Sequence, residues 1–214
     1  IRGELLTGWQ ESLPADAPNH FLIDVLPGQV EPLRTFLADR GQPAVQVHPM
    51  VRARLAGING APVSAADYDN PRAKRLVRRT FNLSWSEQMP PANSLAEGRW
   101  WRPERATGQW SVARGLAQRL GIEVGDRLEF RIAGEPVTGT VVNLRKVDWD
   151  SFRVNFFVLG APGMLEDYAP TYITSFYVPP ERRTLLPALV GRFPNVTVID
   201  VDAVMQRVRT IIDR

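Results

Sequence analysis

Two carboxylates and a hydroxyl lie within four residues of one another in the stretch VDWDSFRVNFFV, which spans residues 147–158. Asp148 and Asp150 flank Trp149, and Ser151 follows them. An Asp-x-Asp pair offers oxygen ligands to a divalent cation, and a carboxylate beside a serine has the residue types for acid–base or nucleophilic hydrolysis. The first question is therefore whether this stretch forms a hydrolytic site.

The sequence around this cluster lacks the elements that such chemistry needs. No G-x-S-x-G turn surrounds Ser151, and no glycine-rich loop opens a helix after a strand. The two histidines, His20 and His48, have no metal-ligand spacing, and there is no cysteine. We therefore predict no catalytic, metal-binding or cofactor-binding residues. We expect Trp149 to fill a corner of the fold, with the two aspartates bonded to turn amides.

A second group of candidates combines arginines with aromatic side chains. The run RAKRLVRR at 72–79 precedes Phe81 and Trp85, a combination that can bind nucleic acid. The segment LVRRTFNLSW alternates, which places both aromatics on the apolar side of one predicted strand. We therefore predict a solvated strand edge protected by arginines, and no nucleic-acid partner.

A third candidate is the pair Trp100 and Trp101, which stands between Arg99 and Arg102. The segment before the pair is rich in Pro, Asn and Gly and is predicted to be a loop. We interpret the pair as an anchor for this loop. An apolar contact for a lipid-like ligand or a partner is the alternative.

The bulk composition is that of an ordinary globular protein. The 214 residues are 44% hydrophobic and 23% charged, and the net charge of +3 does not require a polyanionic partner. The length allows one large domain or two small ones. No apolar run reaches the roughly 20 residues that span a bilayer. Because position 1 is Ile, we expect the chain to be a piece of a longer protein.

Helices are predicted at both ends of the chain. The first has apolar residues four apart, at Leu5, Trp9 and Leu13. The last has a 3-4-3 apolar seam, at Val201, Val204, Val208 and Ile211. Asp200 or Asp202 is well placed to cap this last helix.

The remaining elements indicate an α+β fold. The first part predicts strand, helix and strand, at 20–26, 30–40 and 44–58, with Asn59-Gly60 as a hairpin turn. After residue 150 the pattern returns, with strands at 154–160, 173–178 and 195–201 and a helix at 180–192. The middle is mostly strand, with a short helix at 113–120 before strands at 127–132 and 136–147. We predict an α+β layer formed by both ends of the chain, with a mainly β subdomain inserted between them.

Seven segments, spread in order over nearly the whole chain, carry a resemblance to a known family. They are ELLTGWQESLPADAPNHFLIDV, HPMVRARLAGINGAPV, FNLSW with EGRWW, LAQRLGIEVGDRLEFRIAG, LRKVDWDSFRVNFFVL, PTYITSFYVP and FPNVTVIDVDAV. With these segments the chain resembles the periplasmic core domain of the MacB/FtsX-like ABC transporter permeases, most closely the YbbP-type permeases. His48 stands where an aromatic residue is usual in the family, which counts against a chemical role for it.

The resemblance implies a domain organisation and a location. Residues 1–17 would form an N-terminal helix that extends from a transmembrane helix. Residues 18–57 and 151–214 would form a porter-like α+β subdomain with a C-terminal helix, and residues 58–150 an inserted mainly β subdomain. The chain would be a periplasmic domain of a bacterial inner-membrane protein.

The resemblance also implies a function without catalysis. The domain would transmit ATP-driven motion of transmembrane helices to a periplasmic partner or substrate, in export or extraction of lipid-like or hydrophobic compounds. The implied partners are a cytoplasmic ABC ATPase subunit, a second homologous periplasmic domain in the same chain or a dimer mate, and a periplasmic esterase. The ATPase activity would reside in the separate cytoplasmic subunit, and the isolated domain is expected to be a monomer.

An alternative from a different functional class stays open at this point. The chain would then be a soluble periplasmic hydrolase that uses Asp148, Asp150 and Ser151, or a ligand-binding domain with Trp100 and Trp101 in its pocket. An Asp150→Asn variant separates the two, because a hydrolase would lose activity with its fold intact.

Overall fold

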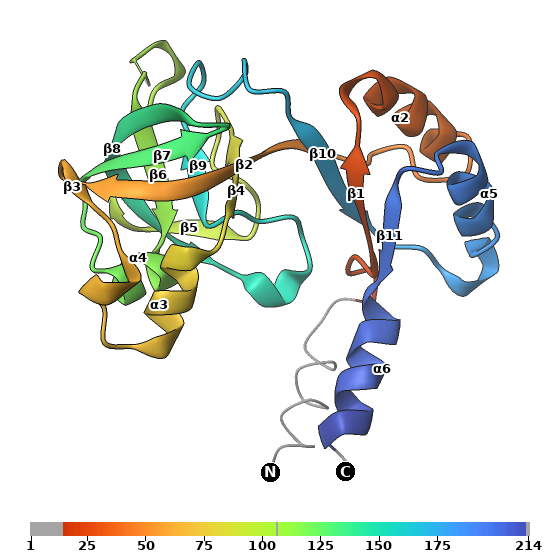
Figure 1. Cartoon of the computed structure of the whole chain (residues 1–214). Helices are drawn as coiled ribbons and strands as arrows, with labels where there is room; N and C mark the ends of the chain where they lie inside the picture. The colour runs from red at the N-terminus through yellow and green to blue at the C-terminus, as the bar shows by residue number, and fades with distance from the viewer. Residues whose placement is uncertain (1–14, 106, 213–214) are drawn as a thin grey trace. The chain divides into compact units, whose positions relative to one another are not determined.

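The computed structural model of the chain describes residues 15–105 and 107–212, with side chains up to Arg207 (Figure 1). The predicted N-terminal helix therefore lies almost wholly outside the described residues. The chain forms two compact units. The first unit comprises Ile1–His48, Trp149–Val154 and Thr171–Arg214, and the second unit comprises Pro49–Asp148 and Asn155–Pro170.

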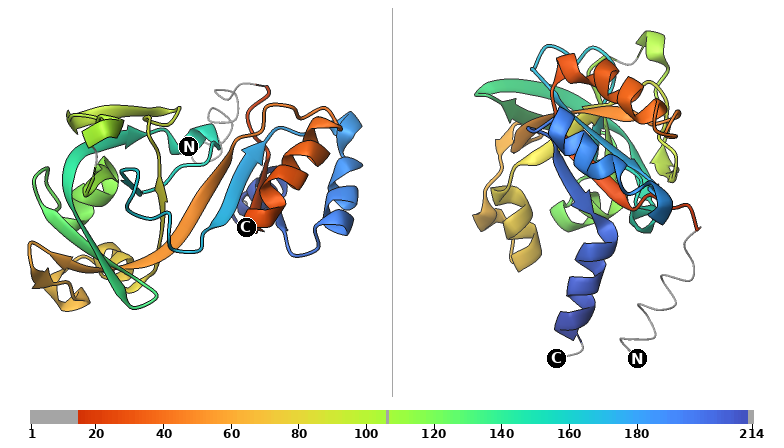
Figure 2. Two further views of the ribbon diagram at one scale, coloured as in Figure 1. Left: turned by 90° about the horizontal axis from the view of Figure 1, so that it is seen from above. Right: turned by 90° about the vertical axis from the view of Figure 1, so that its right-hand side faces the viewer.

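The first unit is built on three antiparallel strands. β1 (His20–Val25) lies between β10 (Thr171–Phe176) and β11 (Thr197–Asp200). Figures 1 and 2 show α2 (Val30–Ala38) and α5 (Leu185–Arg192) side by side against one face of this sheet. Apolar residues of β1 and of both helices form its core, among them Leu22, Val25, Leu33, Leu37, Leu185 and Leu189. Residues 18–48 and 171–200 thus contain the mixture of helix and strand predicted for the two ends of the chain, whereas residues 49–57, which were predicted to belong with them, lie in the second unit.

Helix α6 (Val201–Ile212) begins directly after β11. Oδ1 of Asp200 accepts a hydrogen bond from the Ala203 amide at 3.2 Å, so of the two predicted candidates, Asp200 and Asp202, Asp200 is the N-cap. Val201 is buried, but the side chain of Val204 is 45% exposed. The first half of the predicted apolar seam is therefore only partly covered within the described part of the chain, and Val208 and Ile211 lie outside the described side chains.

The second unit contains a sheet that closes on itself. Each strand pairs with the next in the order β2–β4–β9–β6–β8–β7, and β7 pairs with β2 again. Their bounds are β2 Val47–Ile58, β4 Phe81–Trp85, β9 Val158–Gly160, β6 Gln109–Ala113, β8 Glu135–Val147 and β7 Arg127–Ile132. The short β3 (Ala61–Pro62) pairs with β2. β5 (Asn93–Gly98) pairs antiparallel with the C-terminal part of β8. We call this closed set of strands the strand ring.

Large apolar side chains and two helices complete the second unit. Trp110 is fully buried, and its ring meets Phe130 edge-on at 5.1 Å between centroids. Figure 1 shows α3 (Pro71–Arg78) and α4 (Arg114–Leu120) together at one end of the ring. Both helices contribute buried residues to the same core as the strands, so helices and ring form one packed body.

The hairpin predicted at Asn59-Gly60 is confirmed. Asn59 and Gly60 have φ angles of 53° and 81°, and they join β2 to β3. Two consecutive positive φ values define the turn type whose twist matches two antiparallel strands, and Asn-Gly is the pair that adopts it at least cost. The predicted strands at 127–132 and 136–147 are confirmed as β7 and β8.

The strand predicted from LVRRTFNLSW is wrong over its first half. Residues 71–78 form α3, and only Phe81–Trp85 form a strand. The side chain of Asn70 accepts a hydrogen bond from the Arg72 amide at 2.8 Å, and Pro71 occupies the first helical position, so two helix-start signals outweigh a chance alternation. The basic run is therefore the outer face of a helix and not a strand edge.

The predicted boundary at residue 151 also differs from the structure. The apolar stretch VNFFVLG was assigned to the layer formed by the chain ends, but Asn155–Pro170 belong to the second unit. The reason is strand pairing: β9 lies between β4 and β6, parallel to the first and antiparallel to the second. The prediction of a central strand at 154–160 is correct only for Val158–Gly160, which form β9 and are all buried, whereas residues 154–157 are not strand.

Candidate functional site

The Asp148–Ser151 stretch is a turn at the end of β8. Trp149–Ser151 form a 3-10 turn, and the φ angle of Phe152 is 56°. Oγ of Ser151 accepts a hydrogen bond from the Arg153 amide at 3.3 Å, which is a local turn contact. The side chain of Trp149 is 45% exposed, so the expectation that it fills a buried corner is wrong. A fully buried arginine lies three positions before Asp148.

That residue is Arg145, whose side chain is fully buried in the second unit. Its Nε donates to Oγ of Ser111 at 2.6 Å, and one terminal nitrogen donates to Oδ1 of Asn93 at 2.6 Å. The other terminal nitrogen donates to the carbonyl oxygens of Phe156 and Phe157 at 2.8 and 3.2 Å. One guanidinium thus joins β8, β6 and β5 to the segment that returns from the turn.

The network around Arg145 continues into neighbouring loops. Ser111 donates to Oδ1 of Asn143 at 2.5 Å, and Nδ2 of Asn143 donates to the carbonyl of Arg99 at 3.1 Å. Burial lowers the pKa of Arg145 to about 10, which still leaves it charged at neutral pH. Its partners are neutral oxygens, so this charge is stabilised by dipoles and not by an ion pair.

Arg145 was not among the residues singled out from the sequence, although a signal was present. Along β8, Val137, Gly139, Val141, Asn143 and Arg145 are all buried; they alternate with more exposed residues as far as Asn143, and Leu144 is buried as well. A period of two therefore puts a charged residue in phase with the inward apolar side chains. An in-phase arginine without an obvious acidic partner predicts a buried polar network.

A second polar cluster lies where the chain enters and leaves the sheet of the first unit. His20 is paired across β1 and β11 with Asp200, and its Nε2 lies 3.7 Å from Oδ2 of that residue. His20 is fully buried, and its Nε2 has no hydrogen-bond partner among the described residues. Asn19 bonds both backbone groups of Val178 through its side chain, and its carbonyl accepts from the Val201 amide at 2.8 Å.

Burial dominates the protonation of both histidines. It lowers the pKa of His20, an effect that Asp200 opposes and Arg183 reinforces. It also lowers the pKa of His48, with Arg34 acting in the same direction. Within the described residues, no group of three or more His, Cys, Asp or Glu side chains is arranged to hold a metal ion.

Trp100 and Trp101 are more enclosed than the sequence suggests. Trp101 is only 5% exposed and donates its indole N–H to the Ser86 carbonyl at 3.0 Å. Trp100 is half-buried and donates to the Glu87 carbonyl at 2.8 Å. Their ring centroids are 4.2 Å apart. The interpretation of the pair as an anchor for its loop therefore agrees with these contacts, and the outer ring also lines a groove.

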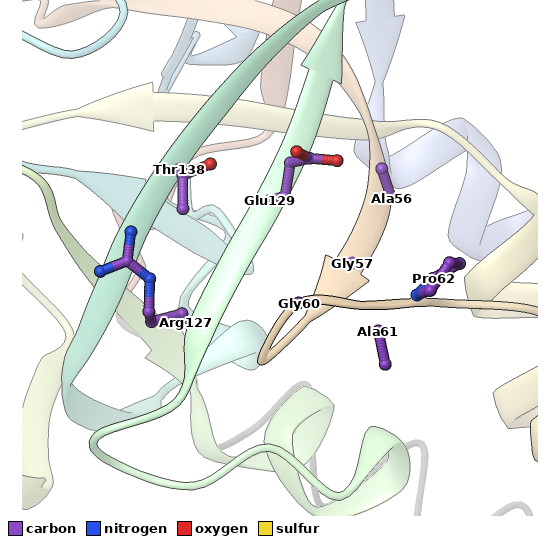
Figure 3. A pocket seen from close by; sticks show the side chains of 8 residues that line it. All are labelled: Ala56, Gly57, Gly60, Ala61, Pro62, Arg127, Glu129 and Thr138. Atoms are coloured by element: carbon purple, nitrogen blue, oxygen red, sulfur yellow. The ribbon is translucent and has the colours of Figure 1, made fainter.

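A separate small pocket lies beside the β2–β3 hairpin. Figure 3 shows its lining, which combines Arg127, Glu129 and Thr138 on one side with small residues around Gly57 on the other. Its volume is about 180 Å³. Glu129 also lies 3.9 Å from the guanidinium of Arg131, so its charge is already shared with a neighbour. The pocket combines one cation and one anion, without the pairing of nucleophile and base that catalysis requires.

Comparison with known proteins gives one related sequence. The chain is 34% identical over 208 residues to the uncharacterized ABC transporter permease YbbP of Escherichia coli strain K12. The matched region is 97% of this chain and 25% of YbbP, so the chain spans about a quarter of the length of this relative. No protein-family model matches the sequence.

A solved structure also aligns with the chain. It is a domain of a protein described as a permease from Porphyromonas gingivalis, and the alignment covers 85% of this chain and 88% of that one. The sequence identity is 15% and the TM-score is 0.36. Within residues 15–105 and 107–212, no helix is long and apolar enough to cross a membrane.

Proposed function

The chain belongs to the YbbP-type ABC transporter permeases, of which it matches one segment, and we propose that it is an extracytoplasmic domain that transmits motion and catalyses no reaction. ATP-driven rearrangement of transmembrane helices would move the two ends of the chain, and the folded body would carry that displacement outward. The domain would act on a periplasmic partner or on the transported compound.

The pairing of β1 with β11 is the observation that carries this proposal. His20 and Asp200 lie directly opposite one another in adjacent strands, so the incoming and outgoing segments are attached at the same end of one sheet. The Val201 amide, at the first turn of α6, donates to the carbonyl of Asn19. A displacement of α6 would therefore act directly on the sheet, with no flexible linker between them.

The contacts around the pairing of β1 with β11 should make the first unit move as a body when α6 is displaced, instead of deforming. The side chain of Asn19 is held by two hydrogen bonds to Val178, at the end of β10. The core of the first unit packs directly behind these strands. A close-packed interior has low compressibility, so it moves as a body when its edge is displaced.

The remaining parts of the proposal rest on the relationship to YbbP and concern the whole transporter. The chain would be the periplasmic domain of a bacterial inner-membrane protein. ATP hydrolysis would take place in a separate cytoplasmic ABC subunit. A second homologous domain, in the same polypeptide or a dimer mate, would face this one, and the isolated domain would be a monomer. The cargo would be lipid-like or hydrophobic, and a periplasmic esterase is a candidate partner.

A helix break in α6 tests the transmission of motion. Val208→Pro removes a helical hydrogen bond in the middle of α6. In the complete permease with its ATPase subunit, reconstituted in vesicles, we expect ATP hydrolysis to continue while removal of a fluorescent long-chain lipid from the bilayer falls to background. Val208→Ala is the matched control and should extract lipid normally. Wild-type extraction by Val208→Pro would sink the proposal.

The location can be tested separately. This chain contains no cysteine, so a single cysteine at the exposed Ser94 of β5 is a unique label site in a cysteine-free version of the full permease. We expect a membrane-impermeant maleimide to label Ser94→Cys in cells whose outer membrane alone is permeabilised. Labelling that requires lysis of the inner membrane would place the domain on the cytoplasmic side and contradict the proposal.

A further inference from the structure

A groove beside Trp100 has features that neither the fold nor the proposed transmission of motion requires. Its volume is about 520 Å³, within the range of small-molecule sites. It lies entirely within the second unit, between the segment after β5, the 3-10 turn Pro103–Arg105 and the middle of β8.

The wall of this groove is apolar and held in place before any ligand binds. The indole N–H groups of Trp100 and Trp101 are both bonded to backbone carbonyls, and the two rings are in contact. Gly98 has a φ angle of 76°, and a Cβ there would lie 2.1 Å from the Val142 carbonyl oxygen, so only glycine lets this segment run against β8. A rigid wall loses little entropy when it is covered by a ligand.

The rim of the groove is positively charged. Arg99, Arg102 and Arg105 line it, all three are exposed, and its lining includes no carboxylate. In the described part of the chain, none of the three lies within ion-pair distance of an acidic side chain. Val124 adds a further apolar surface and is 40% exposed. The groove thus presents apolar area next to cations with spare hydrogen-bond donors.

We infer that this groove binds a small amphipathic anion, namely a carboxylate or phosphate head group with a linear alkyl tail. The guanidinium groups would bond the head group, and Trp100 and Val124 would cover the first part of the tail. The groove is open and short, and an extent of about 520 Å³ is small for an interface with a protein segment, which favours a small molecule. The inference names the substrate class of the proposed transporter and rests on that proposal for its biological meaning, but its test needs only this chain.

The test is a titration of the 214-residue chain with ten-carbon amphiphiles below their micelle concentrations. The indole signals of Trp100 and Trp101 would be followed by NMR, and affinities measured by calorimetry. We expect decanoate and decyl phosphate to bind at the same two signals, and decyltrimethylammonium, decyl maltoside and inorganic phosphate to bind at least about tenfold more weakly. The ratio of the two anion affinities separates the sources, because tighter binding of decanoate indicates a fatty acid and tighter binding of decyl phosphate indicates a phospholipid.

Two pairs of variants assign the binding to the groove. Arg99→Gln with Arg102→Gln should weaken decanoate binding about tenfold or more, whereas Arg119→Gln, at an exposed arginine of α4, should leave it unchanged. Val124→Glu should repel the anion, whereas Val190→Glu, at a comparably exposed valine of α5, should have no effect.

Four outcomes would overturn the inference. They are no binding of either alkyl anion, equal binding of the neutral maltoside, unchanged affinity in the double arginine variant, and binding of an acidic amphipathic peptide in place of the alkyl anions. None of these outcomes would contradict the proposed transmission of motion, because that proposal is tested in the full permease by lipid extraction and not by ligand binding. A failure of Val208→Pro to uncouple the transporter would likewise leave binding in this groove intact.

Discussion

Two buried basic side chains, Arg145 in the second unit and His20 in the first, are accommodated in opposite ways. Both are fully buried. The guanidinium of Arg145 donates four hydrogen bonds, whereas Nε2 of His20 has no hydrogen-bond partner among the described residues. The two regions therefore differ in the satisfaction of their polar groups and not in burial.

This difference has consequences for each unit. A buried polar network in which every member is bonded fixes one arrangement of its strands, and removing one member leaves several others unsatisfied. A buried group with an unsatisfied atom makes the free energy of unfolding depend on that group's protonation. We therefore expect the Arg145 region to respond strongly to substitution, and the His20 region to respond to pH and to changes at Asp200.

The largest effect is expected for Arg145→Met. Methionine fills much of the same volume but leaves the acceptors on Ser111, Asn93 and the return segment without a donor. At roughly 1–3 kcal/mol for each buried group left unsatisfied, the loss in the free energy of unfolding should be at least about 3 kcal/mol. Urea unfolding of the isolated chain, followed by circular dichroism, measures it.

Two companion variants sharpen this test. Arg145→Lys keeps the charge but lacks the planar fork, so it should lose more than half as much stability as Arg145→Met. Arg119→Met removes an exposed arginine and should change stability by no more than about 0.5 kcal/mol. If Arg145→Met stays within that same margin, the network does not hold the corner.

The contrast between the two regions also shows what the sequence can and cannot predict. Strands β7 and β8, the Asn59-Gly60 hairpin and the Asp200 cap were predicted correctly because each depends on neighbours within a few residues. Local signals also existed for α3, at Asn70 and Pro71, but an alternation of apolar and polar residues concealed them.

The closed strand ring and the Arg145 network depend on contacts between distant residues. β9 pairs with strands that begin 49 and 77 positions before it, and no periodicity in VNFFVLG specifies those partners. Arg145 contacts Asn93, which lies 52 residues earlier in the sequence. The sequence therefore offered Asp148, Asp150 and Ser151 only as an alternative hydrolytic site, because their residue types are visible locally, whereas the distant partners of Arg145 are not.

The second largest effect is expected at the junction of the first unit, for Asn19→Ala. The substitution removes both hydrogen bonds between the Asn19 side chain and the backbone of Val178. We expect the free energy of unfolding to fall by about 1–3 kcal/mol. Asn82→Ala, at an exposed position of β4, is the control and should be nearly neutral. Equal urea midpoints for the two variants would show that Asn19 does not brace the sheet.

The pH dependence of stability should come next in size. Burial lowers the pKa of both His20 and His48 in the folded chain, so between that lowered pKa and about 6.5 the unfolded chain binds more protons. Stability should be full above pH 6.5, fall as the pH drops below it, and level off below the folded pKa values. The slope is at most about 1.4 kcal/mol per pH unit for each histidine.

Proton NMR can follow both histidines directly, because the sequence contains only two. Each ring should titrate below 6.5 in the folded chain, and urea unfolding at pH 7.5 and 5.5 should show lower stability at the lower pH. A His20 ring that titrates above 6.5 would mean that the attraction of Asp200 exceeds the effect of burial. The junction would then gain stability on acidification instead of losing it.

The smallest effect on the free energy of unfolding is expected for Asp200→Asn. This variant separates the role of Asp200 as a helix cap from the effect of its charge on His20. Asparagine is as good an N-cap as aspartate, so the hydrogen bond from Ala203 should survive and the free energy of unfolding should change by less than about 1 kcal/mol. The negative charge that raises the pKa of His20 is lost, so that pKa should fall further. Asp200→Ala removes both the cap and the charge, so the free energy of unfolding should fall by about 1 kcal/mol more than in Asp200→Asn.

If the pKa of His20 is the same in Asp200→Asn as in the wild type, the 3.7 Å between Nε2 of His20 and Oδ2 of Asp200 is proximity without electrostatic coupling. The first unit would then hold its buried histidine by packing and by the 2.7 Å hydrogen bond between Nδ1 of His20 and Oδ1 of Asn19.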